Sequence, residues 1–274
     1  MTFVDLITDY WQWNIPATVI AAGLIAFHII SNGNRLTRKS INYFIGILLF
    51  VLLTFSPIEY FGHNYLFSAH MIQHIILLLI IPPLLLTGTD KEFLSKLFTG
   101  QEMQKYGKFL FYPITAWMFG VGSMWIWHVP LLFIAMMKSH IVHIIEILSL
   151  LAFGLIFAWP VFSPIKLRKL NPLSGSLYLF TACIGCTILG IFITFAPSGF
   201  YSAYMPGNNS TILNFLQFNM GITPDVDQQA AGLIMWVPAC MVYLTIIMIL
   251  MARWYSKSDE ERDEELEPDN LHLP

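Results

Sequence analysis

Two histidines four positions apart carry the first recognisable chemistry of this chain. His70 and His74 lie in the sequence His-Met-Ile-Gln-His, inside a long apolar run. In a helix, residues i and i+4 lie on one face. Neutral imidazole nitrogen is a good ligand for copper and zinc, and such a pair presents two nitrogens to one ion. The pair is therefore a candidate for metal binding.

A carboxylate and more histidines fall in or beside other apolar runs. Glu146 is the only carboxylate well inside such a run, and a lone buried carboxylate is either protonated or needs a cation beside it. The further candidate ligands are His128, His143 and Asp227, with His140, Met71 and Met124 as weaker ones. Thioether sulfur selects for Cu(I), but methionine is also a routine filler of apolar contacts. We predict a copper site, Cu(I) or Cu(II), with zinc as the alternative ion; histidines that only hydrogen-bond neighbouring helices remain the structural alternative.

The composition indicates which kind of protein positions these groups. Hydrophobic residues make up 56% of the 274 residues and charged residues only 11%, where a soluble domain carries about 25% charge. A soluble, nucleic-acid-binding or disordered chain is excluded, because each needs more charged surface. Cys183, Cys186 and Cys240 all lie in apolar runs, which argues against a disulfide framework.

Seven apolar runs are long enough to cross a membrane as helices, because about 20 residues span its hydrocarbon core. They are centred on 15–31, 41–57, 66–86, 109–128, 140–162, 177–196 and 230–252. We therefore expect an all-α bundle of seven transmembrane helices over residues 1–256. The acid-rich segment 257–274 is expected to be a disordered tail.

The basic residues predict how the bundle is oriented. Apart from Lys138, every lysine and arginine follows the first, third, fifth or seventh run, so these connections face the cytoplasm. The N-terminus is then outside and the C-terminus inside. With a rise of 1.5 Å per residue, His70 and His74 lie roughly 6 and 12 Å below the outer end of their helix. His128, His143, Glu146 and Asp227 fall in the same outer half, whereas His28 lies near an inner end.

Three motifs together resemble those of a known family. They are His70 to His74 followed by Pro82-Pro83, Trp127-His128-Val-Pro130, and Asp227-Gln228-Gln229-Ala-Ala-Gly-Leu-Ile-Met-Trp-Val-Pro. The chain resembles the CtaG family of cytochrome c oxidase assembly proteins from about residue 10 to 255. The resemblance implies a multi-pass protein of the bacterial plasma membrane that helps copper reach the CuB centre of a haem-copper oxidase. The implied partners are the oxidase subunit that carries CuB, membrane lipids and an extracytoplasmic copper donor, with no nucleic acid.

The resemblance also has a consequence for individual positions. The family's histidine pair, Trp-His and acidic-Gln-Gln motifs fall on His70 and His74, His128, and Asp227 to Gln229, and its outer tyrosines match Tyr201 and Tyr204. The fifth span of the family commonly contains His-x-x-Glu-His. Here His143 and Glu146 fit, but Ile147 replaces the second histidine, so His140 is the substitute candidate.

Three functions are compatible with these residues. The first is a non-catalytic copper chaperone, whose histidines and weak methionine or carboxylate ligands allow the ion to be exchanged. The second is a zinc-dependent seven-helix membrane hydrolase, with Glu146 or Asp227 as general base. The third is a haem protein with two axial histidines. The resemblance favours the chaperone.

Overall fold

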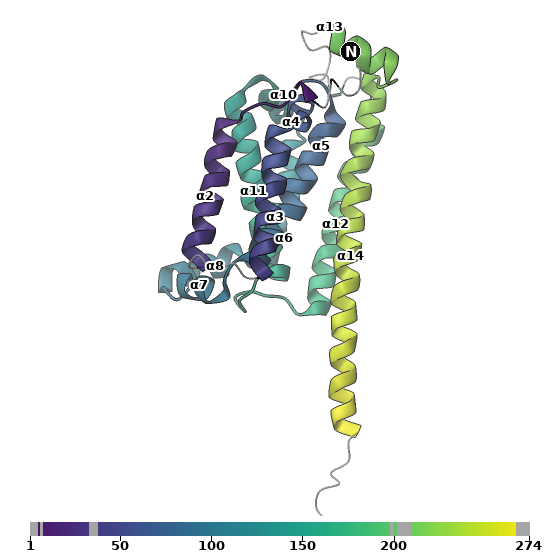
Figure 1. Cartoon of the computed structure of the whole chain (residues 1–274). Coiled ribbons are helices and arrows are strands. Elements are labelled where there is room, and N and C mark those ends of the chain that lie inside the picture. The colour runs from purple at the N-terminus through teal and green to yellow at the C-terminus, as the bar shows by residue number, and fades with distance from the viewer. Residues whose placement is uncertain (1–4, 6–7, 33–37, 198–199, 202–209, 267–274) are drawn as a thin grey trace, which may run out of the picture.

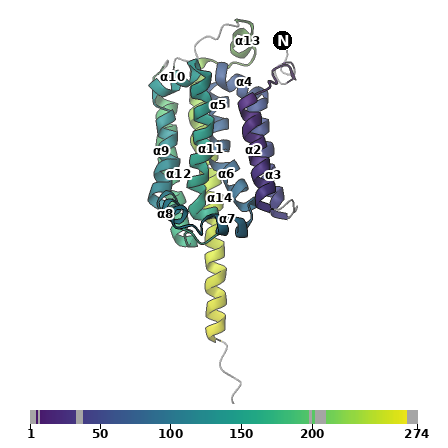
Figure 2. The same ribbon diagram turned by 90° about the vertical axis from the view of Figure 1, so that its left-hand side faces the viewer.

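The computed structural model describes residues 5, 8–32, 38–197, 200–201 and 210–266, and for 210 and 257–266 it describes the backbone alone. All regular elements in these ranges are helical. The long helices run side by side in one bundle (Figures 1 and 2). Helical structure is expected here, because an apolar segment in a membrane must satisfy its backbone groups internally.

The helices have the following bounds. The first half of the chain forms α2 (Ile15–Asn32), α3 (Arg38–Phe55), α4 (Pro57–Asn64), α5 (Phe67–Ile75), the π-helix η1 (Ile76–Ile80), α6 (Ile81–Gly88), α7 (Lys91–Leu97) and α8 (Gln101–Leu110). The second half forms α9 (Pro113–Trp127), α10 (Pro130–Lys138), α11 (His140–Phe162), α12 (Pro172–Phe195), α13 (Ser210–Asn214), the π-helix η3 (Phe215–Asn219) and α14 (Pro224–Leu266).

Six of the described helices are long and apolar enough to cross a membrane, and a seventh span exists if a bent pair counts as one. The six are Ile15–Asn32, Arg38–Phe55, Phe67–Gly88, His140–Phe162, Pro172–Phe195 and Pro224–Ser256. The protein is therefore a multi-pass helical membrane protein. The predicted bundle is confirmed at this level; the orientation of the chain stays a prediction.

The fourth predicted span, 109–128, is not one continuous helix in the structure. Helix α8 ends at Leu110, α9 begins at Pro113, and the two are bent by 58°. Proline is favoured in the first turn of a helix and has no N–H for a continuous one, so Pro113 starts a new helix. Helix α9 alone has 15 residues, about 22 Å of helix at 1.5 Å per residue.

The last helix extends beyond the bundle. Helix α14 packs along α12 and then continues past the other helices to Leu266 (Figure 1). It therefore runs through the boundary expected between residues 256 and 257. The rest of the predicted tail, 267–274, lies outside the described residues.

Close approach of α12 and α14 depends on a small residue. A Cβ placed on Gly232 of α14 would lie 2.6 Å from the backbone nitrogen of Thr194 and 2.8 Å from the carbonyl oxygen of Gly190, both on α12. Glycine therefore allows the two backbones to touch, as in other membrane helix pairs.

This contact predicts the effect of adding one methyl group. Gly232→Ala should destabilise the bundle by about 1–3 kcal/mol through overpacking, seen as a lower melting temperature of the purified protein in detergent. Gly122→Ala on α9 is the control, because a Cβ there would meet nothing within 4 Å. Equal melting temperatures for the two variants would contradict the packing account.

Candidate metal centre

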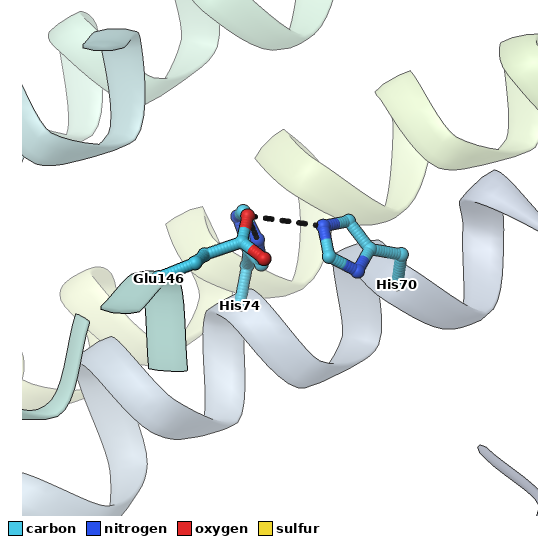
Figure 3. A group of neighbouring side chains, drawn as sticks. All are labelled: His70, His74 and Glu146. Atoms are coloured by element: carbon cyan, nitrogen blue, oxygen red, sulfur yellow. Dashed lines mark hydrogen bonds and ion pairs between the residues drawn. The ribbon is translucent and has the colours of Figure 1, made fainter. Parts of the chain in front are cut away.

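Two histidines of α5 and a glutamate of α11 converge inside the bundle. Nε2 of His74 lies 2.9 Å and Nε2 of His70 lies 3.3 Å from the same atom, Oε1 of Glu146. Figure 3 shows the Glu146 side chain reaching toward both imidazoles. One ligand atom from each residue lies within 4.8 Å of the other two, and all three side chains are buried, with exposures of 1 to 2%. This three-residue group can hold a metal ion.

The hydrogen bonding of this group is incomplete without a further partner. Nδ1 of His70, Nδ1 of His74 and Oε2 of Glu146 are buried and have no hydrogen-bond partner among the described residues. Buried polar atoms without partners are rare and cost about 1–3 kcal/mol each. One of the three, Oε2, belongs to the carboxylate itself, so Glu146 has room for a further partner such as a cation.

A third histidine, His128, pairs with a methionine sulfur next to this group. His128 caps the C-terminal end of α9, and its Nδ1 bonds to the carbonyl oxygen of Met124. Because a carbonyl can only accept, Nδ1 carries the proton and Nε2 keeps a lone pair. That Nε2 lies 3.1 Å from Sδ of Met71, and the His128 ring centroid lies 5.2 Å from that of His74. Two electron-pair donors therefore face each other, as ligands of one soft cation do.

A second polar layer lies above the group, on α4 and the start of α11. Nδ1 of His143 lies 3.5 Å from Oε1 of Glu59, and the His63 and His143 rings stack with centroids 4.5 Å apart. Burial raises the pKa of Glu59 to about 7 and lowers the pKa of His63. Glu59 therefore exchanges its proton near neutral pH, and burial disfavours the charged form of His63.

Asp227 holds the N-terminal end of α5 in position. Its carboxylate, on α14, accepts hydrogen bonds from the backbone N–H of Phe67 (2.6 Å), the backbone N–H of Ser68 (3.1 Å) and the Ser68 hydroxyl. These N–H groups belong to the first turn of α5, where the helix itself offers no acceptor and the N-cap residue, Leu66, makes no side-chain bond. Asp227 thus caps the helix that carries His70 and His74. It is not in the three-residue group.

The other predicted ligands are placed as follows. His143 is buried one layer above the group, and His140 is exposed at the start of α11. Met124 is buried and contributes its carbonyl oxygen to His128. Ile147, which replaces the family's second histidine, is buried in the apolar core.

Residues of the other motifs support the surrounding helices. Gln228 donates to the carbonyl oxygen of Ala196 (2.9 Å), and the Tyr201 hydroxyl donates to the carbonyl oxygen of His128 (3.0 Å). Tyr204 lies outside the described residues. The Cys183 and Cys240 sulfurs approach to 2.7 Å between α12 and α14, and neither belongs to the histidine group.

Glu59 and Gln73 were not among the site residues predicted from the sequence. Gln73 donates to Oε2 of Glu59 (2.6 Å) and to the carbonyl oxygen of Leu53 (3.2 Å). Gln73 lies between the two histidines of the motif, and Glu59 is a carboxylate just beyond an apolar run. The sequence shows that both side chains are polar. It does not show that they form a hydrogen bond, because this depends on how α4 folds back over α5.

Fold and site define a class: a multi-pass helical membrane protein with a buried histidine–carboxylate group. A family model described as "Cytochrome c oxidase caa3 assembly factor (Caa3_CtaG)" matches residues 23–257. The chain therefore belongs to the caa3 cytochrome c oxidase assembly factor family.

"Uncharacterized protein ML1998" of Mycobacterium leprae (strain TN) is 25% identical to this chain over an alignment of 228 residues, and the match covers 76% of this chain and 33% of that protein. The chain thus spans about a third of the length of this relative. No solved structure matches.

The capping role of Asp227 predicts a stability effect. Asp227→Asn removes the negative charge at the N-terminus of α5 and leaves one acceptor oxygen for three donors, so unfolding should become easier by about 1–2 kcal/mol. The measurement is thermal unfolding in detergent. Asp225→Asn, at an exposed position of the same helix turn, is the control and should leave the melting temperature unchanged. If Asp227→Asn melts like the wild type, the cap does not stabilise α5.

Proposed function

We propose that this protein is a non-catalytic assembly factor that binds copper in the group formed by His70, His74 and Glu146 and helps to deliver it to the CuB centre of a cytochrome c oxidase. Family membership supports the assembly role. The observation that carries the copper proposal is the convergence of two buried imidazoles on a buried carboxylate whose second oxygen, Oε2, has no hydrogen-bond partner among the described residues.

The thioether beside the group favours copper over zinc. Zinc sites in proteins use cysteine, histidine and carboxylate ligands, whereas thioether sulfur selects Cu(I). Met71 faces the lone pair of His128 at 3.1 Å and lies on the same helix as both histidines of the group. Neutral nitrogen and thioether ligands bind copper without the strength of thiolates, which suits a protein that must release its cargo.

The cargo would be handled on the outer side of a bacterial plasma membrane. The distribution of basic residues supports an outside location for the N-terminal end of the bundle, by the positive-inside rule. The group lies toward that end, because α5 begins there (Figure 1). The proposed partners are the oxidase subunit that carries CuB, an extracytoplasmic copper donor and the surrounding lipids.

Replacing the sulfur tests which ion is bound. Met71→Leu keeps an apolar side chain of similar size, so Cu(I) affinity should fall about tenfold or more while Zn²⁺ affinity stays unchanged. Competition titrations of the purified protein with chelators for each ion measure this. Met235→Leu is the control, because Met235 is equally buried but lies on α14 in the apolar core.

Two results would contradict the copper assignment. Stoichiometric zinc in the purified wild type together with esterase or amidase turnover would favour a zinc hydrolase. A haem Soret band in its visible spectrum would favour a haem protein.

Loss of one imidazole tests the assembly role in cells. His74→Gln should lower oxidase activity and the copper content of the isolated oxidase severalfold, with unchanged amounts of this protein in the membrane, because a ligand is lost and the bundle is retained. His28→Gln is the control: His28 is also a buried histidine of a span, packed against Tyr43 and Phe44 on α3. Normal copper in the oxidase of His74→Gln cells would refute the delivery role.

A further inference from the structure

A cavity of about 250 Å³ opens at the end of the bundle where α2 and α11 begin. It is formed by the segment before and at the start of α2, by α4, and by the start of α11, whose ends lie together in Figure 2. Four side chains in its lining can ligate a metal: Glu59, His63, His140 and His143. An apolar membrane bundle has few such groups, so four around one cavity require an explanation.

The ligating groups form a graded series from the surface to the buried centre. His140 is exposed, Glu59 has an exposure of 14%, His143 of 3%, and both His70 and Glu146 of 1%. Side chains that can ligate a metal therefore continue from the exposed surface to the buried centre of the bundle.

Neighbouring members of the series are within reach of one another. Glu59 Oε1 lies 3.5 Å from His143 Nδ1, and the rings of His63 and His143 are 4.5 Å apart. The centroids of His143 and His70 are 6.3 Å apart, and His70 Nε2 lies 3.3 Å from Glu146 Oε1. Consecutive members of the series are therefore neighbours in space.

Hydrogen bonds hold the side chains of this series in place and leave nitrogen and oxygen lone pairs available to an ion. Gln73 holds Oε2 of Glu59, so Oε1 faces His143. Nδ1 of His63 is buried without a hydrogen-bond partner among the described residues. A Cβ on Gly62 would lie 3.1 Å from the backbone nitrogen of His70, so α4 sits close over α5. The α4 side of the cavity is thus next to the buried group of His70, His74 and Glu146.

We propose that this cavity is the entrance through which copper reaches the buried centre, with His63, Glu59 and His143 as successive transient ligands. Each step exchanges one nitrogen or oxygen ligand for the next, and the ion keeps its charge and oxidation state. The proposal rests on the copper-binding function proposed above and adds the route to it. A carboxylate early in the route attracts the cation, and neutral imidazoles pass it to the interior.

The test separates the rate of copper uptake from the final occupancy. The purified protein in detergent is mixed in a stopped-flow instrument with Cu(I) bound to a coloured weak chelator, and loss of the chelator colour reports transfer. Glu59→Gln and His63→Ala should slow transfer about tenfold, while the copper bound at equilibrium stays at the wild-type level. Asn64→Ala lines the same cavity without removing an imidazole or a carboxylate and should load at the wild-type rate. Equal melting temperatures show that the variants are folded.

The outcomes distinguish this proposal from the copper function. If the wild type binds copper and both variants load as fast as Asn64→Ala, the entrance proposal is overturned and copper binding stands. If the variants lose equilibrium binding as fully as His70→Ala, these residues are permanent ligands and the entrance proposal also falls. If the wild type takes up no copper, both proposals fall.

Discussion

The structure depends on burying one carboxylate between two imidazoles. An isolated carboxylate inside an apolar bundle costs several kcal/mol, so Glu146 must meet a partner. His70 and His74 both face its Oε1, while Oε2 and both Nδ1 atoms remain without partners among the described residues. A cation bound between the three side chains would interact with the carboxylate and accept one nitrogen lone pair from each imidazole. The same incomplete pairing that makes the group costly makes it able to hold a metal ion.

Several contacts fix the two helices that meet at this group. Asp227 caps α5 from α14 and so determines where the first turn of α5 begins. Deeper in the bundle, a Cβ on Gly154 of α11 would lie 2.7 Å from Pro82 and 2.8 Å from the carbonyl oxygen of Leu78, so glycine lets α11 touch the lower part of the same span. The π-helix η1 begins two residues after His74, and such local widening often occurs at functional sites. The centre is thus held by its supporting helices, not by the ligands alone.

Local features were predictable from the sequence, and contacts between distant segments were not. Most spans follow from the length of the apolar runs, and the shared face of His70 and His74 follows from helical spacing. The bend before α9 was missed, because hydropathy alone did not register Pro113 as a helix start. The capping role of Asp227 joins residues 160 positions apart, and the pairs Met71 with His128 and Glu59 with His143 depend equally on helix packing. The sequence identified Asp227 as a polar residue that faces the bundle interior. It could not distinguish a metal ligand from a residue that caps a helix.

The central claim is that donors from α5, α9 and α11 meet at one copper ion. X-ray absorption spectroscopy at the copper K-edge, on purified protein loaded with Cu(I), tests it most directly. The account predicts scattering from at least two imidazoles together with one sulfur, that of Met71. A spectrum with two sulfurs and no imidazole would contradict it and would place the ion at Cys183 and Cys240 instead.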